Sequence, residues 1–258
     1  MKDADDRSIM LLATALSQAR RAVALTGAGI STESGIPDFR SPGGVWSRHA
    51  PVLYDDFLRD AGERRRYWQI RKETIPGFMA ARPNLGHLVL ARLEAAGRLR
   101  AVVTQNIDEL HQRAGSRRVL ELHGTAMKVQ CLECDRRYSG EEVQARLETG
   151  EQEPVCDSCG GILKSMTVSF GQPLPPGVWM EAVQEARGCD LFLVLGSSLM
   201  VQPAASLPET AVRHGARLFI VNRDPTPLDA LATGVVRASI GPTMEAAMKA
   251  LGELGSEP

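Results

Sequence analysis

Residues 22–40 read AVALTGAGISTESGIPDFR, an apolar run that leads into a glycine-rich polar loop. The run from Ala22 to Leu25 has no polar alternation, which is typical of a parallel strand buried on both faces. Gly27 and Gly29 allow a tight turn whose free N–H groups could approach a phosphate. The same glycines also fit an ordinary strand-to-helix connection, so alone they leave nucleotide binding open.

The composition is that of an enzyme-sized globular protein. The chain has 258 residues, enough for one large domain with an insert or for two domains. Its 30 Lys and Arg residues nearly balance its 31 Asp and Glu residues, which argues against a nucleic-acid partner or an anionic membrane. The N-terminus does not resemble a signal peptide, and no apolar run is long enough to span a bilayer. We therefore expect a cytoplasmic protein with no nucleic-acid or membrane partner.

Apolar strands alternate with helical patterns along most of the chain. Helices are expected over residues 6–20, 84–97, 178–186 and 204–213, and further strands over 100–104, 119–122, 191–195, 218–221 and 235–240. This alternation predicts an α/β fold, a Rossmann-like parallel sheet with helices on both faces. A helical insert with a cofactor loop is expected over 43–83 and a small zinc-binding module over 128–164. The Rossmann-like sheet domain is then discontinuous, over 1–42, 84–127 and 165–258.

Four of the five cysteines form two Cys-x-x-Cys pairs, Cys131 with Cys134 and Cys156 with Cys159. Such pairs in polar, turn-prone segments are typical of one tetrahedral Zn²⁺ site rather than of two local disulfides. Four thiolates leave no open coordination position, so we expect the zinc ion to be structural. The fifth residue, Cys189, is interpreted as a small buried apolar side chain.

Polar residues follow further predicted strands at their carboxyl ends, where open parallel sheets bind ligands. Residues 104–108 read TQNID, residues 196–198 read GSS and residues 222–224 read NRD. His123 ends another strand, and a histidine there can act as a general base. A structural role is the alternative for His123, and the competing histidines are His49, His87, His111 and His214. Together with the glycine turn, these sets indicate one extended ligand as large as a dinucleotide.

In their order along the chain, these motifs resemble the sirtuins, the NAD-dependent protein lysine deacylases. The resemblance covers nearly the whole chain. It rests on residues 27–31, 35–40 and 104–108, on His123-Gly124, on the paired cysteines, and on Phe170-Gly171, residues 196–198 and Val221-Asn222.

The resemblance implies NAD as co-substrate, an acylated lysine in a protein or peptide as substrate, and one structural Zn²⁺. Asp108 would take the nicotinamide amide, and Phe39 would shield the reactive ribose face. Val168, Phe170 and Gly171 would form an edge along which the peptide adds as a strand. The implied cofactor-binding residues are Gly27, Ala28, Gly29, Thr32, Asp38, Phe39, Arg40, Gln105, Asn106, Ile107, Asp108, Gly196, Ser197, Ser198, Asn222, Arg223, Asp224 and Ile240.

The implied reaction begins when the acyl oxygen attacks the ribose carbon as nicotinamide leaves. His123, with Asn106 as the second catalytic residue, then removes a proton from a ribose hydroxyl. The products would be free lysine, nicotinamide and an O-acyl-ADP-ribose. Protein mono-ADP-ribosylation at the same NAD site is the alternative. A hydride-transferring dehydrogenase is disfavoured, because this sequence has no acidic residue at the end of a second strand roughly 20 positions after the glycines. A nucleic-acid-binding zinc ribbon is disfavoured, because the sequence has no basic stripe.

Two segments depart from the family pattern. Residues 164–172 read KSMTVSFGQ, whereas the family usually has a proline, an acidic or amide residue, a second aromatic residue and a final Glu in this substrate-binding segment. Members that remove succinyl or malonyl groups carry a Tyr-x-x-Arg pair for the acyl carboxylate. The nearest equivalent here is Trp68-Gln69-Ile70-Arg71. We expect Arg71 to lie on the surface of the helical insert and the pocket to accept neutral acyl groups.

Overall fold

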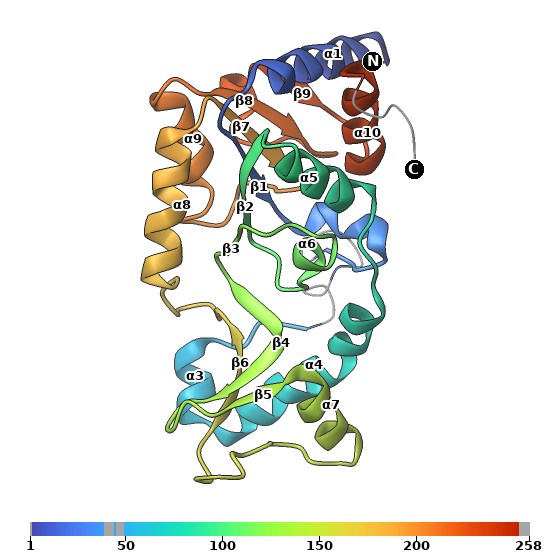
Figure 1. Cartoon of the computed structure of the whole chain (residues 1–258). Helices are drawn as coiled ribbons and strands as arrows, with labels where there is room; N and C mark the ends of the chain where they lie inside the picture. Colours follow the sequence, from blue (N-terminus) through green and yellow to red (C-terminus); the bar gives the residue numbers. More distant parts are fainter. Residues whose placement is uncertain (1, 39–43, 45–48, 253–258) are drawn as a thin grey trace.

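The computed structural model describes residues 2–38, 44 and 49–252, with side chains described from residue 6 onward. Its centre is a six-stranded sheet in the order β3-β2-β1-β7-β8-β9, and every neighbouring pair in it is parallel (Figure 1). The strands are β1 (Ala22–Thr26), β2 (Leu99–Thr104), β3 (Val119–Glu121), β7 (Leu191–Leu195), β8 (Arg217–Val221) and β9 (Gly234–Val236). From β1 the chain moves outward to β3 and then returns to β7, so the switch point of the sheet lies at β1.

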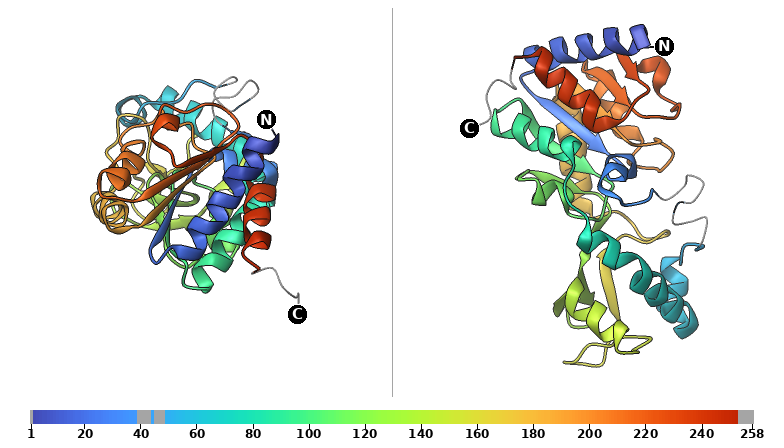
Figure 2. Two further views of the ribbon diagram at one scale, coloured as in Figure 1. Left: turned by 90° about the horizontal axis from the view of Figure 1, so that it is seen from above. Right: turned by 90° about the vertical axis from the view of Figure 1, so that its right-hand side faces the viewer.

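Helices cover both faces of this sheet (Figures 1 and 2). One face carries α1 (Lys2–Gln18), α5 (Leu85–Ala95) and α10 (Ile240–Ala250), and the other carries α8 (Pro176–Gly188) and α9 (Ser206–Arg213). The side chains of β1 alternate between these two faces. Ala22 and Ala24 pack into the apolar core on the first face, and Val23 and Leu25 pack into the core on the second. Side chains that alternate between two covered faces give an unbroken apolar strand. The predicted α/β fold is confirmed.

The prediction for one strand is wrong at the C-terminal end of that strand. The strand expected over 235–240 stops at Val236, and Ile240 instead begins α10. Pro242 lies in the first turn of that helix, where a missing N–H is tolerated. Ser239, in extended backbone, is the residue that precedes the helix.

Two smaller units are inserted into the sheet domain and lie together at the lower end of Figure 1. One consists of α3 (Tyr54–Arg59) and α4 (Ala61–Ala80). The other is an antiparallel sheet in the order β5-β4-β6, with β4 (Gly124–Cys131), β5 (Arg137–Ser139), β6 (Leu163–Thr167) and the helix α7 (Gly140–Glu148). Trp68 of α4 is buried against Val129 and Leu163 of this unit. The expected limits at 128 and 164 fall inside β4 and β6, and the division into domains stays a prediction.

The remaining short elements lie near the carboxyl ends of the central strands or in connections. They are η1 (Ala28–Ile30), η2 (Thr32–Ser34), α6 (Leu110–Arg113) and η3 (Asp229–Leu231). None of the helices in the described part of the chain is long and apolar enough to cross a membrane.

Candidate active site

A cavity of about 1480 Å³ opens at the carboxyl ends of the central strands. Its walls also include residues of α4 and the segment that follows β6. Pockets for a single small molecule usually measure roughly 300–1,000 Å³, so this volume is sufficient for a dinucleotide together with part of a second substrate.

The structure brings most of the predicted site residues to this one cavity. Ile240 lines a smaller adjoining cavity of about 190 Å³ that shares Gly29 and Thr32 with the first. Phe39 and Arg40 lie outside the described residues. The predicted residues on the main wall are Gly27, Ala28, Gly29, Thr32, Asp38, Gln105, Asn106, Ile107, His123, Val168, Phe170, Gly171, Gly196, Ser197, Ser198, Asn222, Arg223 and Asp224. Their individual binding roles stay predictions.

The glycine turn after β1 differs from the expectation in one respect. The N–H groups of Gly27 and Gly29 are not free, because they donate to the carbonyl oxygens of Leu195 and Gly196 at 3.1 and 2.9 Å. A Cβ at either glycine would lie 2.7 Å from backbone atoms of Gly196. These glycines are therefore required by the close approach of the β1 and β7 turns. That contact forms the floor of the cavity, where a pyrophosphate can approach backbone without side chains in the way.

Behind the cavity wall, three polar side chains form a buried chain of hydrogen bonds. Asn106 Nδ2 donates to Ser31 Oγ at 3.0 Å, and Ser31 Oγ donates to Asp108 Oδ2 at 2.6 Å. Asp108 Oδ1 accepts from the N–H of Leu110 at 2.9 Å. Burial raises the pKa of Asp108, while the bond from Ser31 opposes that rise. Asp108 is only 3% exposed and is not on the cavity wall, so in this structure its carboxyl group orients Asn106 through Ser31.

His123 lines the cavity, and one neighbouring group determines which of its two ring nitrogens carries the proton. Its Nδ1 lies 2.9 Å from the carbonyl oxygen of Gln105, and a carbonyl can only accept, so Nδ1 carries the proton. Nε2 is then the unprotonated nitrogen of the neutral ring. Burial lowers the pKa of His123, which keeps the imidazole neutral at physiological pH. The geometry and charge state are those that a general base requires.

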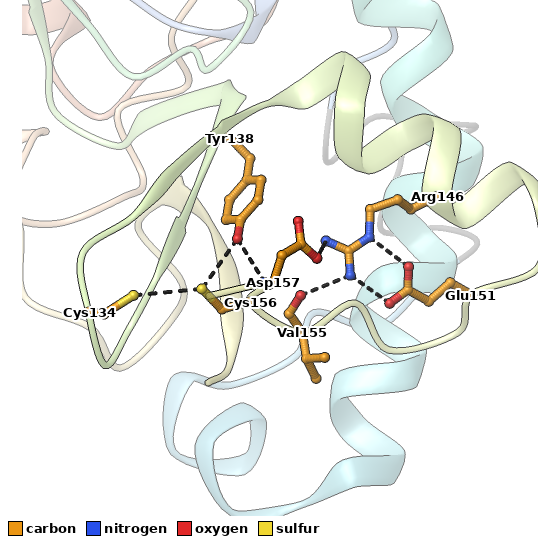
Figure 3. Close-up of polar contacts among 7 residues, drawn as sticks. All are labelled: Cys134, Tyr138, Arg146, Glu151, Val155, Cys156 and Asp157. Atoms are coloured by element: carbon orange, nitrogen blue, oxygen red, sulfur yellow. Dashed lines mark hydrogen bonds and ion pairs between the residues drawn. The ribbon is translucent and has the colours of Figure 1, made fainter. Parts of the chain in front are cut away.

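The four paired cysteines meet in the small inserted sheet. Their sulfur atoms all lie within 4.8 Å of one another, a spacing that suits four thiolates at Zn–S distances of about 2.3 Å around one tetrahedral ion. Figure 3 shows how the surrounding residues hold one ligand: Tyr138 Oη donates to Cys156 Sγ at 3.2 Å and accepts the N–H of Asp157 at 3.0 Å. The residues are positioned to hold one structural zinc ion, remote from the reacting groups.

The expectation that Arg71 is a surface residue is wrong. Its side chain lies on the cavity wall and is 8% exposed, because α4 turns one face toward the cavity. Tyr67, Arg71, Thr74 and Phe78 all lie on that wall. Their spacing of three or four residues is the periodicity of one helix face, and this periodicity is the sequence signal that could have revealed them.

A parallel sheet with a dinucleotide-sized cavity at its switch point, joined to a four-cysteine module, defines a nucleotide-dependent enzyme with a structural metal site. The Sir2 family model matches residues 27–203, and the chain belongs to the Sir2 family.

The chain is 46% identical over 234 residues to NAD-dependent protein deacetylase 2 of Streptomyces coelicolor, covering 88% of this chain and 96% of the relative. It is 42% identical over 243 residues to NAD-dependent protein deacylase 2 of Archaeoglobus fulgidus, covering 94% and 95%. A solved structure of Sir2 with a p53 peptide and NAD⁺ superposes with a TM-score of 0.87 at 41% identity, covering 94% of this chain and 98% of that chain.

Proposed function

We propose that this chain is an NAD-dependent protein lysine deacylase that transfers the acyl group from lysine to ADP-ribose and releases nicotinamide. The observation that carries the proposal is the neutral His123 ring on the wall of a cavity large enough for both substrates. The deacetylase and deacylase relatives support the same activity over almost their full length. Mono-ADP-ribosylation of protein, the alternative, is not favoured by them.

Some residues of the cavity would bind the dinucleotide, and others would act on the reacting groups. NAD supplies a ribose whose bond to nicotinamide can be broken. The turns after β1, β7 and β8 would hold the dinucleotide, with Asn106 fixed beside the reacting ribose by Ser31. His123 Nε2 would take the proton from the attacking hydroxyl. The N–H of Val168 donates to the carbonyl oxygen of His123 at 2.9 Å, so the proposed peptide edge is hydrogen-bonded to the backbone of the base.

One assay separates the proposed activity from its alternatives. The protein is incubated with NAD and an acetylated peptide, and all products are identified by mass. We expect loss of the acetyl group together with equal amounts of nicotinamide and O-acetyl-ADP-ribose. His123→Ala should lower turnover by about 10²- to 10⁴-fold, the usual effect of losing a positioned base. Transfer of ADP-ribose to protein, formation of NADH, or near-normal deacylation by His123→Ala would each contradict the proposal.

The substrate class can be narrowed by a buried cation at the end of the cavity that α4 lines. We propose that this end accepts acyl groups that terminate in a carboxylate, in place of the neutral groups expected from the sequence. Arg71 lies on the cavity wall and is 8% exposed. Lys164 is 2% exposed, does not line the cavity, and donates from Nζ to the carbonyl oxygen of Thr167. No carboxylate of the described residues pairs with either cation. Unpaired buried cations are unfavourable, so an acidic acyl group would supply a missing counter-charge.

The polar atoms around these cations support the same substrate class. Arg71 Cζ lies 5.8 Å from the ring centroids of both Tyr67 and Trp68. Its Nη2 donates to the Ala126 carbonyl at 2.7 Å, and a guanidinium group has further N–H donors that a ligand could use. The Tyr67 hydroxyl and Ser165 Oγ are buried without partners among the described residues. Burial raises the pKa of Tyr67, while the nearby Arg71 and Lys164 charges lower it, so both cations lie close to this hydroxyl group.

The acyl preference is tested with succinyl and acetyl versions of one peptide. Arg71→Met should reduce kcat/KM for the succinyl peptide by about 10- to 100-fold, since a charge-assisted bond is lost, and should change the acetyl reaction by less than about threefold. Lys72→Met removes a cation from the same helix away from the cavity wall and should leave both reactions unchanged. Rapid acetyl but absent succinyl turnover by the unmodified protein would contradict this preference.

We also propose a cytoplasmic location, because two Cys-x-x-Cys pairs stay reduced and able to bind zinc in a reducing compartment.

A further inference from the structure

Two histidines that do not touch the cavity lie together beneath its loops. His87 of α5 and His111 of α6 have ring centroids 4.8 Å apart, and their side chains are 0% and 1% exposed. Within the described residues, His87 Nε2 and His111 Nδ1 have no hydrogen-bond partner. Buried polar atoms without a partner are rare and costly, so two of them in adjoining rings require an explanation.

The proton on His87 is assigned by a backbone contact. The N–H of Asn84 donates to His87 Nδ1 at 3.3 Å, so this nitrogen carries no proton of its own. Burial lowers the pKa of His87 to about 4, and the neutral ring must therefore hold its proton on Nε2. The unpartnered nitrogen of His87 is a hydrogen-bond donor.

The proton on His111 is assigned by two threonines. Thr26 Oγ1 donates its only proton to Thr104 Oγ1 at 2.8 Å. His111 Nε2, which lies 2.9 Å from Thr26 Oγ1, must then be the donor of that second bond. Burial, together with the neighbouring His87, lowers the pKa of His111, so the ring is neutral and its Nδ1 is an acceptor. The two unpartnered atoms are complementary.

We propose that His87 and His111 are positioning residues that link the two loops on either side of the NAD cavity. His87 Nε2–H donates to His111 Nδ1 through one bridging water, and His111 donates through Thr26 to Thr104. Thr104 Oγ1 also accepts the N–H of Asn106 at 3.0 Å. The chain therefore ends on the backbone of a residue at the reacting end of the cavity.

The other end of the same chain reaches the glycine loop. Asn84, which donates its N–H to His87, also donates from Nδ2 to the carbonyl oxygen of Ile30 at 2.7 Å and to Ser34 Oγ at 2.8 Å. Ile30 and Ser34 belong to the short helices η1 and η2 that follow β1. With the proposed bridge between the two imidazoles, one continuous set of bonds would run from the residue 30–34 loop to Asn106. It fixes the spacing between the two walls that NAD must bridge.

The test measures NAD binding directly by calorimetry, so it does not depend on deacylation being the reaction. His111→Phe keeps a ring in the same place, and Thr26→Val keeps the shape of the threonine. Each variant should raise the Kd for NAD by about 5- to 30-fold, the effect of losing one buried hydrogen bond. Both substitutions interrupt the same chain of hydrogen bonds. The double variant should therefore bind NAD no more weakly than the single variant with the higher Kd.

Two controls separate positioning from general destabilisation. Thr26→Ser retains the hydroxyl and should bind NAD as the unmodified protein does. Leu90→Ala opens a cavity in the same helix as His87, where Leu90 is fully buried, and should lower the Tm while changing the Kd for NAD by less than twofold. The proposal is overturned if the single-variant effects add in the double variant, if Thr26→Ser binds as weakly as Thr26→Val, or if Leu90→Ala weakens NAD binding equally.

Discussion

At the residue scale, the chemistry depends on which nitrogen of His123 carries the proton. The carbonyl oxygen of Gln105, 18 positions earlier in the chain, selects the tautomer with Nε2 free. Burial then lowers the pKa of the ring. A base that remains neutral below the ordinary histidine pKa of about 6.5 would keep working in mildly acidic solution.

This charge state predicts the pH dependence of the reaction. Protonation of His123 removes the base, so kcat/KM should stay level as the pH falls to 6.5 and decrease only at lower pH. The profile of kcat/KM for NAD is measured between pH 5 and 8, with saturating peptide and varied NAD. His214→Gln, a change at an exposed histidine, should leave the acid limb in place, whereas a decrease centred above pH 6.5 would mean that His123 is not the titrating base.

At the element scale, the junction of β4 and β6 holds the proposed peptide edge against the base. Gly124 opens β4 with a φ of +69° and pairs with Thr167 of β6. A Cβ at this position would overlap the carbonyl oxygen of Met166. Only glycine fits both the left-handed backbone and the close approach of the second strand.

We therefore expect Gly124→Ala to be strongly destabilising. The left-handed backbone costs about 1–2 kcal/mol for a residue with a side chain, and the overlap adds about 1–3 kcal/mol. Chemical denaturation measures the loss. Gly97→Ala is the matched control, because Gly97 has a φ of +71° with open space around it, so it carries the backbone cost without the overlap. Equal losses in the two variants would show that the contact with Met166 is unimportant.

At the scale of the whole molecule, we expect the inserted units to depend on zinc binding for part of their stability. Two of the four cysteines, Cys131 and Cys156, are themselves buried in the apolar cluster that includes Trp68 and Leu163. Small units of this kind gain much of their folding free energy from the metal. Since β6 leads directly to the proposed peptide edge at Val168, loss of zinc should affect peptide binding before NAD binding.

Zinc removal tests that dependence. Chelation, or Cys156→Ser, should abolish bound zinc, lower the Tm by on the order of 10 °C and weaken binding of an acetylated peptide more than binding of NAD. Cys189→Ala changes a cysteine outside the cluster, so elemental analysis should still find one zinc ion per chain. Full retention of peptide binding by the zinc-free protein would contradict the expected coupling.

Burial of His87 leads to a second prediction for the whole molecule, which concerns how the free energy of unfolding depends on pH. His87, with its pKa lowered to about 4 by burial, binds fewer protons when folded than when unfolded. Its contribution to stability is therefore complete above about pH 6.5 and is lost as the pH falls toward 4, at about 1.4 kcal/mol per pH unit. Denaturation at several pH values should show this slope, and His87→Gln should reduce it while His214→Gln should not.

The sequence by itself determined the fold class, the four paired cysteines that could hold zinc, and the part of the cavity wall that follows the strands. These features depend on short-range patterns: apolar runs with no alternation, paired cysteines, and polar residues directly after strands. The carboxyl ends of parallel strands meet at one edge, so a local motif after each strand is enough to place it at the shared site.

The tertiary structure alone decided the chemical state of the site. Arg71 is buried because α4 packs on Ala126, 55 positions away, and the N–H groups of Gly27 and Gly29 are occupied because the β7 turn lies against them. The tautomer of His123 and the protons of the His87–His111 pair likewise depend on carbonyl, amide and hydroxyl groups from other elements. Burial and hydrogen-bond direction arise from residues that are distant in sequence, so a local pattern can name a side chain but cannot fix its charge or its partners.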